Sequence, residues 1–171
     1  MAGLQGGSVI RVLGVDPGLT RAGFGLVEEQ KGRLVALTHG TIRAQGETVA
    51  EQLATLRARL AAVVREFTPD SIAVERLFVT RNQRTAIRVG QASGIALLVA
   101  AEAGIGVVEY GPLQVKQAVV GTGSATKDQV SFMVRRLLLL AEAPDTADAA
   151  DALALAICHL HSYRLSARAA T

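Results

Sequence analysis

Four acidic residues of this chain stand where apolar runs begin or end, and a solvated acid is hard to explain at such positions. Two of them each end a short apolar run, and the other two lie three positions apart at the start of the last one. They are Asp16, Glu75, Asp148 and Asp151. Carboxylates gathered at core elements repel one another, and burying an unpaired charge is costly. The chain must therefore fold so that a divalent cation, typically held by oxygen ligands, can compensate them.

The length and composition predict a single domain with a core of small aliphatic residues. The chain has 171 residues, of which 50% are hydrophobic but only 4% aromatic, with no tryptophan. A chain of this size is long enough for one sizeable core. We expect this domain to span residues 9–163, after an N-terminal extension at 1–8. Residues 164–171 lack a core pattern and are predicted to form a mobile tail.

Charge, cysteine content and hydropathy further limit what class of protein this can be. The net charge of +3 and the pI of about 9.5 weakly favour a polyanionic partner. The single cysteine, Cys158, excludes an internal disulfide and a cysteine-rich zinc site, and is expected to be a small buried hydrophobe. Residues 1–7 lack the apolar core of a signal peptide, and the longest apolar stretch, 94–101, is far shorter than the ~20 residues of a membrane span. We expect a soluble, cytoplasmic protein without a membrane partner.

The first half of the chain predicts three antiparallel strands, a helix and a fourth strand. Residues 9–16, 22–28 and 33–42 have strand patterns with short connections, as in a meander. A capping box, Thr48 with Glu51, opens an amphipathic helix that Pro69 ends. Residues 71–75 are the next strand, and a helical crossover of this kind favours parallel pairing with a strand of the same sheet.

The second half predicts one more strand and four helices. A helix at about 81–103 carries Gly90 and Gly94 on one face, which suits either packing on the sheet or a subunit interface. Residues 107–110 form the fifth strand. Three helices follow: a short one from Pro112, one from Thr126 to about Leu140, and a last one from Asp145 or Thr146 to about Tyr163. The pattern is α/β, a five-stranded mixed sheet flanked by helices.

The topology brings the four acids together. If the first and fourth strands are parallel neighbours, Asp16 and Glu75 emerge at the same edge of the sheet. Asp148 and Asp151 share one face of the last helix, roughly one turn apart. Each acid also has a simpler interpretation, as a turn aspartate, a surface acid or a helix-start acid, but all four together favour a metal site. Two Mg²⁺ ions about 4 Å apart would suit phosphodiester hydrolysis without a side-chain nucleophile.

Basic and aromatic residues near these acids are candidates for phosphate and base contacts. The basic candidates are Arg76, Arg81, Arg84, Arg88, Lys116 and Lys127. Arginines three and four apart form a stripe on a helix, which suits either phosphate binding or a solvated face. Phe78, just past a strand end, suits either stacking on an unpaired base or core packing. Residues 121–127 resemble a nucleotide-binding loop but lack its Gly-Lys-Ser/Thr ending, so a P-loop is rejected.

Four motifs, in order and at compatible spacing, resemble the RuvC family of bacterial Holliday-junction resolvases. The motifs are GVDPG (14–18), VERLF (74–78), QVKQ (114–117) and DAADALA (148–154). The resemblance covers residues 9–163 and implies an RNase H-like fold and a homodimer. It implies an endonuclease dependent on Mg²⁺, with Mn²⁺ as a substitute, that nicks two strands of like polarity at a four-way junction in recombination and repair. The branch-migration complex RuvA–RuvB is the implied partner.

The resemblance also implies roles for individual residues. Asp16, Glu75, Asp148 and Asp151 match the four metal-binding acids of the family. Phe78 matches an aromatic that contacts bases near the junction centre, and Lys116 and Lys127 match basic residues of the DNA cleft. Three rival functions remain open: a related nuclease for RNA–DNA hybrids or flaps, a junction-binding protein without catalysis, and a sugar-kinase or actin-like ATPase. The complete acid quartet argues against the second, and the short chain argues against the third.

Overall fold

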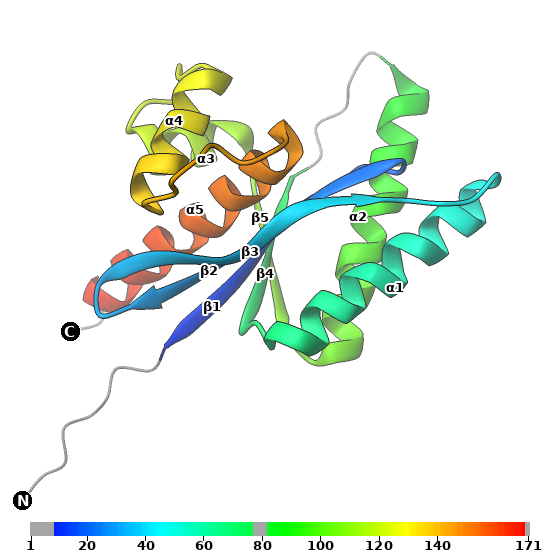
Figure 1. The fold of residues 1–171 in the computed structure, drawn as a ribbon, viewed down its shortest axis with the longest axis horizontal. Coiled ribbons are helices and arrows are strands. Elements are labelled where there is room, and N and C mark those ends of the chain that lie inside the picture. Colours follow the sequence, from blue (N-terminus) through cyan, green and yellow to red (C-terminus); the bar gives the residue numbers. More distant parts are fainter. Residues whose placement is uncertain (1–8, 77–81, 170–171) are drawn as a thin grey trace, which may run out of the picture.

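The computed structural model describes residues 9–76 and 82–169, and it has a five-stranded sheet between two layers of helices (Figure 1). The strands are β1 (Ile10–Asp16), β2 (Arg21–Gln30), β3 (Arg33–Arg43), β4 (Ser71–Glu75) and β5 (Gly106–Tyr110). The helices are α1 (Val49–Phe67), α2 (Gln83–Ala103), α3 (Pro112–Val120), α4 (Lys127–Leu137) and α5 (Ala147–Ala169). The α1 and α2 helices cover one face of the sheet, and the other three lie on the opposite side (Figure 1). The predicted fold class is confirmed.

The strand order β3-β2-β1-β4-β5 makes β1 and β4 neighbours, which explains how two acids come to the same end of the sheet. The β1 strand pairs antiparallel with β2 and parallel with β4, as predicted. Val15 lies beside Val74 in the parallel ladder, so the residue that follows each of them leaves the sheet at the same end. Those residues are Asp16 and Glu75, and both strands point their carboxyl ends toward this edge.

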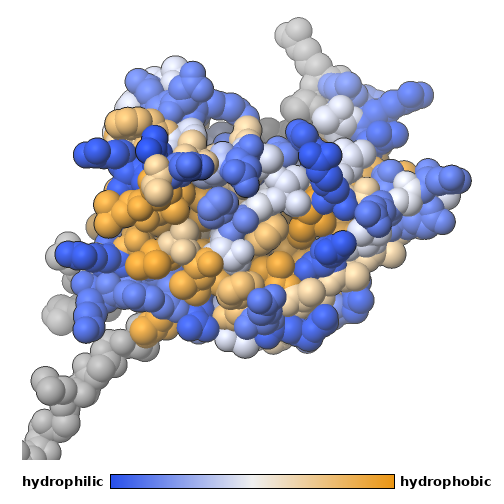
Figure 2. All heavy atoms as spheres, viewed as in Figure 1, coloured by the Kyte–Doolittle hydropathy of each residue, from blue (hydrophilic) through white to orange (hydrophobic). Residues whose placement is uncertain are grey.

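Alternation along the strands builds an apolar core on each face of the sheet. Val12 and Val27 pack with buried residues of α3, α4 and α5, including Leu153. Leu13 and Leu26 point to the other face and pack with α1 and α2. Figure 2 shows apolar residues reaching the surface on both sides of the β2–β3 hairpin, next to α4 and α5 on one side and α1 on the other.

The α2 helix is the one helix in the described ranges that is long and apolar enough, by length and composition alone, to cross a membrane. Its small residues Ala92, Ala96 and Ala100 are buried in the core with α1 and the sheet, as in a soluble domain. The opposite side exposes Leu97 and Leu98 at 42% and 45%. A packed helix with a partly exposed apolar side accounts for this composition without a membrane.

The end of α4 differs from the sequence prediction, and the cap of α5 is the second of the two predicted alternatives. The α4 helix ends at Leu137, before the predicted Leu140, because Leu139 adopts a left-handed conformation with φ 52°. Arg135 then binds the freed carbonyls of Leu140 and Ala141. Thr146, not Asp145, caps α5 by accepting a hydrogen bond from the backbone of Ala149 at 3.1 Å.

The prediction that the last helix ends near Tyr163 is wrong, because α5 continues to Ala169. Arg164 connects this extension to the β2–β3 hairpin through an ion pair and a hydrogen bond. Its Nε lies 2.8 Å from Glu29 Oε2, and its Nη2 donates to Gly32 O at 3.1 Å. The apolar pattern does not reveal this end, since it is held by polar contacts with a distant segment.

Candidate active site

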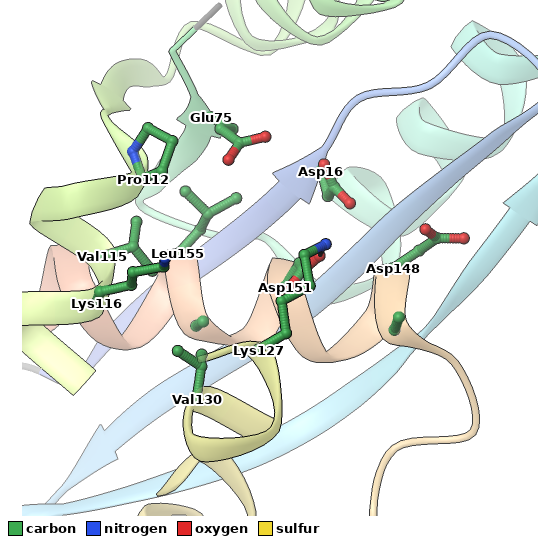
Figure 3. A pocket seen from close by; sticks show the side chains of 12 residues that line it. Asp16, Glu75, Pro112, Val115, Lys116, Lys127, Val130, Asp148, Asp151 and Leu155 are labelled. Atoms are coloured by element: carbon green, nitrogen blue, oxygen red, sulfur yellow. Dashed lines mark hydrogen bonds and ion pairs between the residues drawn. The ribbon is translucent and has the colours of Figure 1, made fainter. Parts of the chain in front are cut away.

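The four acids line one cleft of about 220 Å³ at the carboxyl end of β1 and β4 (Figure 3). Asp16 and Glu75 come from the two strand ends, while Asp148 and Asp151 come from the first turns of α5. The remaining walls come from α3, α4 and α5 and include Pro112, Val115, Lys116, Lys127, Val130 and Leu155. The predicted convergence of the acids on one cleft is therefore what the structure shows.

Two glycines allow α5 to lie close enough to the sheet to form this cleft. A Cβ atom at Gly23 would stand 1.9 Å from the backbone oxygen of Asp148, and one at Gly14 would stand 1.8 Å from that of Ala152. Both glycines lie where α5 crosses β1 and β2, and any side chain there would push the helix away. These glycines are a sequence signal for the site that periodicity alone does not reveal.

Burial and mutual repulsion raise the pKa values of the two strand-end acids. Burial is the largest cause at Asp16, followed by Glu75, Asp151 and Asp148, and together they raise its pKa to about 7. The pKa of Glu75 is also raised, first by burial and then by Asp151. Lys127 opposes both shifts. The cleft is thus a place where negative charge accumulates and where a cation is favoured.

Two basic residues partly compensate the helix acids. Lys127 Nζ lies 3.3 Å from Asp151 Oδ2, and nearby Asp16 and Glu75 also help to raise the pKa of this lysine. Arg21, on β2, places its Nε 3.4 Å from Asp148 Oδ2. This oxygen is buried and, although close to Arg21, has no hydrogen-bond partner. No sequence pattern marks Arg21 as a site residue, because only the packing of α5 on β2 brings it to the site.

The donor set fits a hard divalent cation. It offers four carboxylates, one of them with an unsatisfied buried oxygen and another with a strongly raised pKa. Within the part of the chain that the structure describes, no three acidic, histidine or cysteine side chains already converge around one point as metal ligands would. One oxygen of Asp148 lies near Arg21, and one oxygen of Asp151 lies near Lys127, as Figure 3 shows for the second pair. A bound ion would compete with these basic groups for the two carboxylates.

Of the predicted DNA-binding residues that lie in the part of the chain that the structure describes, two line the cleft. Lys116 and Lys127 line the cleft with the acids. Arg76 and Arg84 do not: Arg76 is exposed and donates from Nη2 to Glu109 O at 3.5 Å, and Arg84 is exposed on the first turn of α2. Phe78 and Arg81 lie outside the described residues.

Comparison with known proteins agrees with this geometry. The family model of RuvC, crossover junction endodeoxyribonuclease, matches residues 12–159. The chain belongs to the RuvC family. The RuvC protein of Syntrophomonas wolfei is 51% identical over 158 residues, which is 92% of each chain. The solved Thermus thermophilus RuvC is 40% identical with a TM-score of 0.85, covering 92% of this chain and 97% of that one. The predicted RuvC membership, and with it an endodeoxyribonuclease, is confirmed.

A second Thermus thermophilus RuvC structure, in complex with a Holliday junction substrate, is 39% identical with a TM-score of 0.87 and covers 92% of this chain and 96% of that one. The yeast mitochondrial resolvase Ydc2 shares the fold, with a TM-score of 0.62 at 14% identity, over 95% of this chain and 86% of that one. These neighbours confirm the predicted RNase H-like fold of the RuvC family.

Proposed function

We propose that this chain resolves four-way (Holliday) DNA junctions by paired, metal-dependent hydrolysis of phosphodiester bonds, in homologous recombination and DNA repair. The single observation that carries the proposal is the convergence of four carboxylates from β1, β4 and α5 on one cleft. Such a cluster is typical of metal-assisted phosphodiester hydrolysis. The substrate follows from the RuvC family, one member of which was solved with a Holliday junction.

In this proposal Asp16, Glu75, Asp148 and Asp151 hold the metal, which is Mg²⁺ or, in its place, Mn²⁺, with two ions in each active site. When bound, the ions supply Lewis acidity and lower the pKa of water. The protein's own contribution is positioning. The two strands and α5 fix the acids in one cleft, and the carboxylates need no acid–base partner from histidine or cysteine.

Lys116 and Lys127 would hold a DNA phosphate against the acids. Both line the cleft, and Lys127 already lies among three carboxylates whose charge it offsets. With cations held by the carboxylates, the Lys127 ammonium group would be available for a phosphate oxygen. Lysine contacts of this kind add affinity and orient the backbone without reading sequence.

Paired cleavage requires two active sites, and a closed homodimer supplies them with the two-fold symmetry of the junction. The exposed side of α2 is the proposed interface. Leu97, Leu98 and Ile87 are exposed there, and nothing lies within 4 Å of a Cβ built at Gly94, so a second helix has room to approach. Contact with RuvA–RuvB, and a place of action in the cytoplasm, complete the proposal by family resemblance.

Four further residues extend the proposed DNA surface beyond the cleft. Phe78 would contact bases near the junction centre and stack on one that is unpaired. Three arginines follow Glu75 in the sequence, close to the start of α2: Arg76, Arg81 and Arg84. Their role would be to bind phosphates of the junction arms.

Competition between substrates tests the proposed function. The protein is offered a labelled four-way junction with an excess of unlabelled junction, RNA–DNA hybrid, flap or plain duplex. The proposal expects only the four-way junction to compete efficiently for cleavage. Preferential competition by the hybrid or the flap would instead assign the chain to another branch of RNase H-like nucleases, and ATP hydrolysis without cutting would exclude a nuclease role.

A further inference from the structure

The end of the β2–β3 hairpin that lies nearest the cleft carries two arginines side by side. Arg21 begins β2 and Arg43 ends β3, and they are direct partners in the antiparallel register. A backbone hydrogen bond from Ala44 N to Thr20 O, 3.0 Å long, continues the pairing beyond them. Directly opposed residues point to the same face with Cβ atoms about 5 Å apart, and like charges in that position are unfavourable. The sheet therefore holds the starts of both side chains next to each other, although two like charges in this position bring no folding benefit.

Strand alternation places this pair on the same face of the sheet as the acids. Ala22 and Ile42, the neighbouring cross-strand pair, are buried against α1 and α2. Gly23 points to the opposite face, where Asp148 crosses it. Since side chains alternate between faces, Arg21 lies on the same face as Gly23, and its contact with Asp148 confirms this. Arg43, as its direct partner, shares that face.

Only one of the two arginines has an anionic partner. Arg21 reaches Asp148 but keeps 57% of its side chain exposed. Arg43 is exposed, and within residues 9–76 and 82–169 its side chain has neither an ion pair nor a hydrogen bond. Two neighbouring positive charges therefore have one carboxylate, which contacts only Arg21, and a bound phosphate group would supply the missing negative charge.

The pair also lies on the opposite flank of the cleft from the lysines. Lys116 and Lys127 come from α3 and α4, whereas Asp148 lies at the far end of the acid row, toward β2 (Figure 3). Arg21 contacts Asp148 from that side. A strand of nucleic acid crossing the acids would meet the lysines on one flank and the arginines on the other.

We propose that Arg21 and Arg43 form a second phosphate-binding site, which holds the DNA backbone one or more phosphates away from the bond that is cut. Paired arginines suit this ligand, because each guanidinium group can donate two hydrogen bonds to a phosphate. The Arg21 side chain is 57% exposed and donates no hydrogen bond to Asp148 Oδ2, so it would bind a phosphate without first leaving that carboxylate. The inference rests on the proposed function, since it requires a DNA strand in the cleft.

Salt-dependent binding tests this site. Arg21→Gln, Arg43→Gln and the double variant are titrated with a four-way junction in EDTA, which prevents cutting, at several salt concentrations. Each lost phosphate contact should lower the slope of log affinity against log salt by about 0.9. Affinity should fall on the order of tenfold for each arginine, because a hydrogen bond to a charged group is lost. Arg43→Lys, which keeps the charge, should retain most of the slope.

Arg33→Gln is the matched control, because it removes an exposed arginine from the other end of the same strand. Its affinity and slope should equal those of the unchanged protein. Thermal unfolding of every variant checks that the fold persists. If Arg43→Gln binds the junction as Arg33→Gln does, with the same slope, the second phosphate site is overturned while the proposed function stands. If the unchanged protein does not bind the junction, both proposals fail together.

Discussion

Lys127 Nζ lies 3.3 Å from Asp151 Oδ2, so the first residue of α4 contacts an acid of the first turns of α5 inside the cleft. The lysine is 81% exposed and the aspartate 36%, which makes the pair a weak contributor to stability. The effect of the ion pair is to hold a positive charge among the four carboxylates.

Replacing Asp151 with Asn keeps the shape of the side chain and removes one of the charges that would bind metal. Even a change to a residue that only supports a metal ligand typically lowers metal affinity or activity by about 10–100-fold. We expect Asp151→Asn to lower junction cleavage by more than about 100-fold while junction binding persists. The rate is measured under single-turnover conditions with Mg²⁺. Asp128→Asn, an acid in the first turn of α4 that does not line the cleft, is the control. Normal nicking by Asp151→Asn would remove this residue from the metal site.

The raised pKa of Asp16 predicts how stability depends on pH without metal. Its pKa of about 7 in the folded protein exceeds the value of about 3.9 in an unfolded chain, so the folded state binds the proton more tightly. This contribution is fully present below about pH 4 and is lost as the pH rises through about 7. Thermal unfolding in EDTA should therefore show a falling melting temperature over that range.

Asp16→Asn should flatten much of this pH profile, since the buried carboxylate is gone. Asp145→Asn, an exposed acid that is not among the lining residues, is the control and should keep the profile of the unchanged protein. Added Mg²⁺ should raise the melting temperature above pH 7, because a ligand that binds only the folded state stabilises it. A profile that Asp16→Asn leaves unaltered would refute this explanation.

Lys116 is expected to contact a DNA phosphate from the α3 side of the cleft. Lys116→Ala should weaken junction association and reduce the salt slope by about 0.9, because one fewer counterion is released on binding. Fluorescence anisotropy at several salt concentrations measures both. The matched control is Arg59→Ala, which removes an exposed cation from α1, on the opposite side of the sheet. A slope equal to that of the control would exclude Lys116 from the phosphate contacts.

Gly23 is predicted to be required for the position of α5. An alanine Cβ there would stand 1.9 Å from the backbone oxygen of Asp148, so the helix must move or the strand must bend. Overpacking of this kind typically costs about 1–3 kcal/mol, and it would displace two of the four acids as well. The free energy of unfolding, measured by chemical denaturation, should fall, and so should the cleavage rate. Gly106→Ala, on β5, has no atom within 4 Å of the new methyl group and is the control. Equal stability of the two variants would contradict the close contact.

Much of this site can be predicted from sequence because it depends on short-range signals. An apolar run bounded by Pro69 and Glu75 places β4, and a helical crossover makes its pairing with β1 parallel, which fixes Asp16 beside Glu75. The spacing of Asp148 and Asp151 then gives one helix face. None of these steps requires knowledge of side-chain packing.

The rest depends on contacts between distant segments. Arg21 reaches Asp148 only because α5 rests on Gly14 and Gly23. The two residues are far apart in the sequence, so no local sequence pattern predicts their contact. The extension of α5 to Ala169 depends on Arg164 meeting the β2–β3 hairpin, far away in the sequence. Arg76 and Arg84 do not line the cleft, so their predicted phosphate contacts would lie outside it.

The most direct test of the central claim uses a mobile four-way junction with each strand labelled in turn. The protein is incubated with it in Mg²⁺ or in EDTA, and the cut positions are mapped. The account predicts nicks at symmetric positions in two strands of like polarity, present with Mg²⁺, absent in EDTA, and lost in Asp148→Asn. Cutting in EDTA, or unaltered cutting by Asp148→Asn, would contradict the claim that these four carboxylates form one metal-dependent catalytic centre.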